Sequence, residues 1–189
     1  MSGGANRVYL ARHGQTALNA AGRLRGLSNP PLDETGIAEA ARLAEVLAAK
    51  NPTMVISSPL QRAVATAQAI ASAAGVEVTV DSRLNDRDYG PVTGQRRADV
   101  EARYGSIDAA PGVEPWTALA DRARSAFLEL VGEHGPGPIA MVSHDAFNCA
   151  LLAQIDPALS GVGQRTACWN QLSRVDGAWR VDAYDLKPD

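Results

Sequence analysis

Short apolar runs recur along the chain and give the first indication of its architecture. The runs RVYLAR at 7–12 and TMVISS at 53–58 are rich in apolar and β-branched residues, and VEVTV at 76–80 alternates between apolar and polar positions. The run PIAMVS at 138–143 is almost entirely apolar, as expected of a strand buried on both faces. The lengths and compositions of these runs predict four strands.

Longer segments with helical periodicity separate these runs. Residues 33–50 carry Ile37, Leu43 and Leu47 near a 3.6-residue period, which predicts an amphipathic helix. Residues 59–75 begin with Pro after a Ser and end in Gly, which are typical start and stop signals of a helix. Further helices are predicted at 95–104, 116–135 and 145–155, and two closing strands at 166–175 and 178–186.

The alternation of strands and helices predicts an α/β fold, a three-layer α/β/α sandwich around a mostly parallel sheet. A chain of 189 residues is long enough for a substantial core, and we expect one domain spanning 1–189. Folds of this type bind ligands beyond the carboxyl ends of their strands. The segments RHG, SSPLQR and SHD, which follow the first, second and fourth strands, should therefore share one edge of the sheet.

Composition and charge exclude several classes of function. The formal net charge of −3 argues against a general nucleic-acid binder, which usually carries a basic surface. Cys149 and Cys168 have neither CxxC nor metal-ligand spacing, so we expect buried free thiols, which suit a reducing compartment. The start of the chain lacks the apolar core of a signal peptide, and no run approaches the roughly 18 apolar residues of a membrane span. We therefore expect a cytoplasmic protein that binds neither nucleic acid nor membrane.

The shared edge concentrates positive charge in an otherwise acidic protein. The three segments bring together two arginines and two histidines: Arg12, His13, Arg62 and His144. These side chains would repel one another without a counter-charge. A phosphoryl group carries about −1.5 to −2 charges near neutral pH, and arginine binds it through two parallel hydrogen bonds. The pattern therefore predicts a site for a phosphate ester.

Two histidines at such a site can take different roles. A neutral imidazole nitrogen is a nucleophile toward phosphorus, whereas a protonated imidazole donates hydrogen bonds to the phosphoryl oxygens. One histidine of each kind would transfer a phosphoryl group covalently without a metal or cofactor. The leaving alkoxide still requires a proton, and the segment RLNDRDYGPVTG at 83–94 offers Asp86 and Asp88.

Four segments together resemble the histidine phosphatase superfamily, the phosphoglycerate mutase-like family. ARHGQT with Asn19 beyond it is similar to the family signature, and SSPLQRAVATA is similar to the segment with the second phosphate-binding arginine. RLNDRDYGPVTG resembles the segment that carries the proton donor, and MVSHDAFNCALL the segment of the second histidine. The resemblance covers nearly the whole chain, in the same order, and implies a phosphoglycerate mutase-like fold.

The resemblance also implies roles for individual residues. His13 would be the nucleophile that becomes phosphohistidine, and Asn19 would be a lesser contact to the phosphoryl group. The residues that hold the phosphoryl oxygens would be Arg12, Arg62 and His144. Asp86 stands where most members have a glutamate that protonates the leaving oxygen, so we assign Asp86 as the proton donor, with Asp88 as the alternative. Asp145 replaces a usual glycine and would either orient His144 or repel a dianion.

Arginines in the loop after the first motif bear on the substrate. Arg23 and Arg25 are either solvated loop charges or contacts to an acidic substrate, and Arg25 is taken here as a candidate substrate-binding residue. The chain is thus expected to be a phosphomonoesterase acting on a small phosphorylated metabolite. Which phosphate ester it takes and in which oligomeric state it works are left open by the sequence.

Three alternative functions are kept open. A cofactor-dependent phosphoglycerate mutase would need a closed pocket that excludes water. Such mutases of the family that this chain resembles generally carry a longer insertion after the proton-donor segment. Here only the stretch from Gly94 to Trp116 separates that segment from the next long helix. A non-catalytic phosphoester-binding module would share the same fold. A metallohydrolase would use the histidines and aspartates as ligands, although the neighbouring arginines would repel a cation.

Overall fold

A computed structural model describes residues 5–188 of the chain. Its six strands form one sheet in the order β3-β2-β4-β1-β5-β6. The strands are β1 (Arg7–Arg12), β2 (Met54–Ser57), β3 (Val78–Val80), β4 (Ile139–Ser143), β5 (Trp169–Val175) and β6 (Ala178–Leu186). The first four pair in parallel, β5 pairs antiparallel with β1, and β6 pairs antiparallel with β5. The mostly parallel sheet agrees with the prediction.

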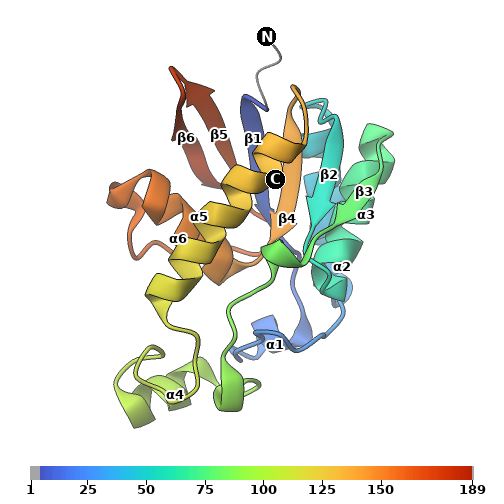
Figure 1. Ribbon diagram of the computed structural model, residues 1–189. Helices are drawn as coiled ribbons and strands as arrows, with labels where there is room; N and C mark the ends of the chain where they lie inside the picture. The colour runs from blue at the N-terminus through green and yellow to red at the C-terminus, as the bar shows by residue number, and fades with distance from the viewer. Residues whose placement is uncertain (1–4, 189) are drawn as a thin grey trace.

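Helices cover both faces of this sheet (Figure 1). On one face lie α2 (Glu34–Ala48) and α3 (Gln61–Ala74), and on the other lie α5 (Trp116–Glu133) and α6 (Asp145–Ile155). The predicted three-layer α/β/α sandwich is therefore confirmed. None of the helices among residues 5–188 is long and apolar enough to cross a membrane.

Strand β1 shows why its apolar run carries no polar alternation. Successive side chains of a strand point to opposite faces of the sheet. Val8 and Leu10 accordingly pack in the core beneath α5 and α6, while Tyr9 and Ala11 pack in the core beneath α2 and α3. Because both faces are covered, the whole run must be apolar until it reaches the end of the strand.

The apolar face of α2 differs from the prediction. Ile37 was expected to lie on that face, but its side chain is 61% exposed. The buried face is formed by Gly36, Ala40, Leu43 and Leu47. Gly36 lies against the backbone of Gln15, where a Cβ atom would overlap the Gln15 backbone. This close approach turns α2 about its axis and leaves Ile37 in solvent.

A smaller apolar cluster lies beyond the carboxyl ends of the parallel strands. Figure 1 shows α1 (Ala17–Ala20) and α4 (Arg97–Tyr104) at this end of the sheet. Leu24 from the loop after α1 packs there with residues in α4 and on either side of it, namely Tyr89, Val92, Val100, Ile107, Ala110 and Val113. The cluster holds the loop with Arg25 and the segment with Asp86 against one another.

Candidate active site

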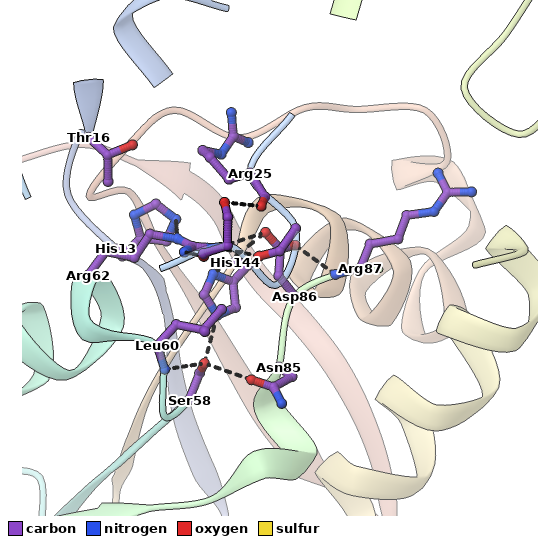
Figure 2. A network of polar contacts seen from close by, with 12 residues as sticks. His13, Thr16, Arg25, Ser58, Leu60, Arg62, Asn85, Asp86, Arg87 and His144 are labelled. Carbon is purple, nitrogen blue, oxygen red and sulfur yellow. Dashed lines mark hydrogen bonds and ion pairs between the residues drawn. The ribbon is translucent and has the colours of Figure 1, made fainter. Parts of the chain in front are cut away.

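Three parallel strands deliver the candidate residues to one edge of the sheet. Arg12 ends β1 and pairs in register with Ser143, the last residue of β4, so His13 and His144 both follow directly. The backbone N–H of His13 donates to the Ser143 carbonyl oxygen at 3.2 Å. Arg62 enters from the first turn of α3, which follows β2. Figure 2 shows the side chains of His13, Arg62 and His144 converging with that of Asp86.

His13 is held in one tautomer. Its Nδ1 lies 2.6 Å from the carbonyl oxygen of Gly14, an acceptor, so Nδ1 carries the proton. Its Nε2 accepts a hydrogen bond from Nε–H of Arg62 at 3.2 Å, so Nε2 presents a lone pair toward the site. Burial, reinforced by the charges of His144, Arg62 and Arg12, holds the pKa of His13 well below its usual value. His13 is therefore a neutral imidazole whose Nε2 lone pair is held toward the site by Arg62.

Arg62 is the hub of the site and is fully buried. Besides His13, its guanidinium donates to the carbonyl oxygens of Gly26 at 2.8 Å and Ser28 at 2.7 Å. Its Nη2 also donates to Oδ2 of Asp86 at 3.2 Å. Because these bonds fix the guanidinium plane, Arg62 ties the loop after α1 to the nucleophile candidate and to the proton-donor candidate.

His144 faces His13 across the site, with 5.2 Å between the ring centroids. Its Nε2 lies 2.8 Å from the hydroxyl oxygen of Ser58. Its Nδ1 is buried without a hydrogen-bond partner and lies 3.8 Å from Oδ2 of Asp86. Burial, followed by the charge of Arg62, holds the pKa of His144 well below its usual value. These surroundings therefore favour the neutral form of both histidines, and a bound dianion would favour protonation of His144.

Asp86 is only 3% exposed, and its Oδ1 accepts from the backbone N–H of Arg87 at 2.8 Å. Burial raises the pKa of Asp86, although the charges of Arg62 and Arg25 oppose the rise. Asp88 is exposed, and its carboxylate accepts from the backbone N–H of Gly90 at 2.8 Å. Of the two aspartates, the structure places Asp86, and not Asp88, among the histidines and arginines.

Arg12, Asn19 and Arg25 line a cavity of about 500 Å³ beside this cluster. Nε of Arg12 and Nε of Arg25 are both buried without a hydrogen-bond partner. Burial lowers the pKa of Arg25, and the charge of Arg12 lowers it further. The side-chain oxygen of Asn19 accepts from the backbone and hydroxyl of Thr16, which caps α1 and leaves the amide NH₂ for a ligand.

A second cavity, of about 780 Å³, reaches Asp86 from the other direction. It is lined by the proton-donor segment, by the 112–115 loop and by α5. Asp86 lines this cavity and Arg12 lines the first, so the cluster between them can be approached from both. A phosphate ester bound at the cluster would have room for the rest of its body.

The charges of the cluster favour an anion. Arg12, Arg25, Arg62 and two histidines meet there, and Asp86 is the carboxylate that pairs with Arg62. Within residues 5–188 no group of three or more His, Cys, Asp or Glu side chains is arranged to hold a metal ion. Buried guanidinium N–H groups without partners are suited to the oxygens of a phosphoryl group.

Asp145 bonds to other partners than His144. Its Oδ1 accepts from the backbone N–H of Gln164 at 3.1 Å and from the thiol of Cys149 at 3.4 Å. The carboxylate thus attaches the start of α6 to the loop before β5. It also lines the cavity of Arg12, where it faces the arginines.

Sequence reasoning missed two residues that build the site. Ser58 contacts His144, as described above, and its position in SSPLQR was the available signal. Arg122 on α5 donates to the carbonyl oxygens of Asn85 at 3.0 Å and Asp86 at 2.8 Å, and to the carboxylate of Glu114. Nothing in the local sequence distinguishes Arg122 from other helical arginines, because its role depends on the packing of α5 against a distant segment.

Comparison with known proteins identifies a family. The model of the histidine phosphatase superfamily (branch 1) matches residues 8–187. A glucosyl-3-phosphoglycerate phosphatase from Mycobacterium tuberculosis is 33% identical over 213 residues, covering 96% of this chain and 95% of that protein. A "Probable phosphoglycerate mutase GpmB" from Salmonella newport is 37% identical over 187 residues, covering 90% of this chain and 84% of that protein.

Solved structures give the same result. A mycobacterial glucosyl-3-phosphoglycerate phosphatase in complex with VO3 superimposes with a TM-score of 0.86 at 31% identity, covering 96% of this chain and 100% of that chain. A phosphoglycerate mutase from Bacillus anthracis superimposes with a TM-score of 0.87 at 21% identity, covering 96% of this chain and 93% of that chain. The second likeness concerns the fold alone.

Proposed function

Because the chain belongs to the histidine phosphatase superfamily and is a phosphomonoesterase of small metabolites, we propose that it works through a phosphohistidine on His13. The phosphoryl group of the substrate moves first to Nε2 of His13 and then to water. The observation that carries the proposal is the fixed tautomer of His13. Its proton is held on Nδ1 by the Gly14 carbonyl oxygen, and its Nε2 lone pair lies beside Arg62.

In the first step, Nε2 of His13 attacks phosphorus and the bond from phosphorus to the ester oxygen breaks. Arg62 releases its hydrogen bond to Nε2 and donates to a phosphoryl oxygen instead. Asp86, whose protonated form is favoured by burial, gives its proton to the leaving alkoxide. The products of this step are the free alcohol, an Asp86 carboxylate and a phosphorylated His13.

In the second step, the Asp86 carboxylate takes a proton from a water molecule, whose oxygen attacks phosphorus. The bond from phosphorus to Nε2 breaks, which restores neutral His13 and releases inorganic phosphate. Water reaches the site because the 780 Å³ cavity beside Asp86 is lined by exposed residues such as Asp88 and Leu27. Both steps use side chains of this chain and need no metal or cofactor.

The phosphoryl oxygens would be held by Arg12, Arg62 and His144, with the amide NH₂ of Asn19 as a lesser contact. The unpartnered Nε of Arg12 and Nδ1 of His144 support these roles, because each is buried with nothing to bond to in the protein. As negative charge develops on the phosphoryl oxygens, these donors stabilise it.

The substrate would carry an acidic group in addition to its phosphate. Arg25 supports this, because its Nε is buried without a partner and lines the cavity shared with Arg12. The M. tuberculosis relative is named for a phosphoglycerate ester, which bears a carboxylate near its phosphate. A reducing cytoplasm, where phosphorylated metabolites occur, suits the free thiols of Cys149 and Cys168. The net charge of −3 does not favour nucleic acid as a partner.

The experiment that tests this function compares glucosyl-3-phosphoglycerate, 3-phosphoglycerate and glycerol phosphate as substrates. We expect release of inorganic phosphate, with the two acidic esters preferred over glycerol phosphate. Rapid interconversion of 3- and 2-phosphoglycerate with little release of phosphate would instead identify a mutase. Absence of turnover on all phosphate esters would indicate a binding module.

Arg25→Ala tests the acidic group separately. Losing a hydrogen bond to a charged partner costs about 1.5–3 kcal/mol, so KM for an acidic ester should rise by roughly 10- to 100-fold. Hydrolysis of p-nitrophenyl phosphate, which lacks the second anion, should change little. Arg42→Ala, which removes an exposed arginine of α2, is the control. Equal losses on both substrates would show that Arg25 does not bind the acidic group of the substrate.

A further inference from the structure

Ser58 lies at the point where three elements meet beneath His144 (Figure 2). Its hydroxyl oxygen is 2.8 Å from Nε2 of His144 and 3.5 Å from Oδ1 of Asn85, and it accepts from the backbone N–H of Leu60 at 3.3 Å. The side chain is completely buried. Neither step of the proposed reaction uses this hydroxyl, and its contacts require an explanation.

The hydrogen-bonding capacity of Ser58 limits what His144 can do. A hydroxyl has one proton and two acceptor lone pairs, and the N–H of Leu60 occupies one lone pair. The proton can therefore point either to Nε2 of His144 or to Oδ1 of Asn85, since both can accept. The hydroxyl proton can point to Nε2 only when Nε2 is unprotonated, and it must point to Asn85 when Nε2 carries a proton.

His144 must present an N–H group to the phosphoryl oxygens, which are acceptors only. The nitrogen that faces the site is Nδ1, because Nε2 is occupied by Ser58. In neutral His144, Nδ1 carries the proton only if Nε2 accepts from the Ser58 hydroxyl. In charged His144, Nε2 also carries a proton, which must be donated to the Ser58 oxygen. The hydroxyl proton then turns to Oδ1 of Asn85.

We propose that Ser58 is a positioning residue that keeps an N–H on Nδ1 of His144 in both protonation states, by turning its hydroxyl from His144 to Asn85 when a phosphate group binds. The inference rests on the proposed role of His144 in holding the phosphoryl group. It assigns Asn85, at the start of the proton-donor segment, as the acceptor that accommodates the change. His144 can thus become an imidazolium without leaving a buried N–H unsatisfied.

The charged groups around His144 decide when this change occurs. The surrounding arginines disfavour a positive charge on His144 when no anion is bound, and a bound phosphate dianion reverses that balance. Asp86 faces Nδ1 at 3.8 Å, and burial raises its pKa, which weakens its tendency to carry a negative charge beside His144. The groups concerned come from β1, the loop after α1, α3, the proton-donor segment and α5: Arg12, His13, Arg25, Arg62, Asp86 and Arg122.

The test is the titration of His144 by NMR in protein saturated with inorganic phosphate. The chain has three histidines, and a His134→Gln variant assigns one of the three signals. A hydrogen bond to a charged group is worth about twice one between neutral groups, so Ser58→Ala should lower the pKa of phosphate-bound His144 by about one pH unit. The value of kcat/KM should fall roughly 10-fold or more, equally for aryl and alkyl esters, because the leaving group is not involved.

Ser57→Ala is the matched control. Ser57 is an equally buried serine, and its hydroxyl donates to the Ser58 carbonyl oxygen at 2.8 Å without contacting His144. The Ser57→Ala variant should have a lower free energy of unfolding but an unchanged pKa of His144. If Ser58→Ala does not fold, Asn85→Ala, at a half-buried position, should lower the same pKa by a smaller amount.

The inference is overturned if the pKa of phosphate-bound His144 is unchanged in Ser58→Ala or, where that variant does not fold, in Asn85→Ala. It is also overturned if Ser57→Ala shifts this pKa by the same amount. This failure differs from a failure of the proposed function. If only the inference is wrong, the unsubstituted protein still forms phosphohistidine and still shows a His144 pKa that rises when phosphate binds. If the proposed function is wrong, the unsubstituted protein shows neither.

Discussion

Burial acts in opposite directions on the two groups that the proposed reaction needs. It lowers the pKa of His13, because the charged form of a base is the imidazolium, and it raises the pKa of Asp86, because the charged form of an acid is the carboxylate. The nucleophile is thereby deprotonated and the proton donor protonated in the same pH range. One buried environment prepares both residues for their roles.

The proton donor can be tested by comparing leaving groups. A nitrophenolate leaves without a proton, whereas an alkoxide does not, and losing a general acid costs about 10²–10⁴-fold. Asp86→Asn should therefore reduce hydrolysis of an alkyl phosphate by this factor while sparing most activity on p-nitrophenyl phosphate. Asp88→Asn, at an exposed position, is the control and should affect both substrates slightly. The opposite pattern would assign the donor to Asp88, and equal loss on both esters in both variants would assign it to neither.

The pKa shifts also predict how activity depends on pH. His13 must be neutral to attack, so activity falls as pH decreases through its lowered pKa. Asp86 must be protonated to donate, so activity falls as pH increases through its raised pKa. We expect a bell-shaped profile of kcat/KM for an alkyl ester, with its maximum on the acidic side of neutral. A profile that is flat between pH 5 and 8 would contradict this pairing.

At the scale of elements, a close contact between α2 and the segment that follows β1 positions the nucleophile. Gly14 follows His13 and lies against the backbone of Gly36, and Gly36 lies against the backbone of Gln15. A Cβ atom at either glycine would overlap backbone atoms of the other element. Because Gly14 also accepts the hydrogen bond that fixes the His13 tautomer, the approach of α2 is part of the catalytic geometry.

A pair of glycine substitutions tests this contact. In an ordinary helix, replacing Gly by Ala stabilises the protein by about 0.5–1 kcal/mol. Gly36→Ala should instead destabilise it by about 1–3 kcal/mol, because backbone atoms must move to admit the methyl group, and should reduce activity. Gly132→Ala in α5, where a Cβ has open space, is the control and should be neutral or stabilising. Urea unfolding measures the change in stability of both variants, and an activity assay measures the loss of activity. A Gly36→Ala variant that is as stable and as active as the unsubstituted protein would refute the contact.

The same scale shows which elements could be predicted from the sequence. The strands were predicted to within a few residues. For β1, β2 and β4 the signal was a continuous apolar run, because these strands are covered on both faces. The buried face of α2 was not, because the exposure of Ile37 follows from a backbone contact at Gly36 that leaves no hydrophobic pattern. The four-residue helix α1 was also missed, since it is too short to show periodicity.

The candidate site divides in the same way. The convergence of His13, Arg62 and His144 could be predicted, because the carboxyl ends of parallel strands meet at one edge. The contacts of Ser58 and Arg122 could not, because each depends on how side chains of distant segments pack.

The whole molecule concentrates unfavourable charge at one end of its sheet. Arg12, Arg25 and Arg62 lie together with two histidines in a protein whose formal net charge is −3. Burial and the mutual repulsion of these groups oppose folding, because in the unfolded chain the same groups are hydrated and far apart. A bound anion would remove this repulsion, so ligand binding and stability should be strongly linked.

Inorganic phosphate should accordingly stabilise the protein. A ligand at 100 times its Kd adds about 2.7 kcal/mol to the free energy of unfolding, which corresponds to roughly 5–10 °C in Tm for a protein of this size. Sodium chloride at the same ionic strength should have a much smaller effect. Arg62→Ala should lose most of the response to phosphate. A Tm that responds equally to both salts would show that the cluster is not an anion site.

The most direct test of the account is a rapid-quench reaction with ³²P-labelled substrate. A phosphohistidine is labile in acid and stable in base, so we expect a label with these properties during turnover, assigned to His13 by mass spectrometry. The label should disappear on a chase with unlabelled substrate, and His13→Ala should show neither label nor turnover. Turnover without any labelled intermediate, or a His13→Ala variant that keeps most of its activity, would contradict the central claim.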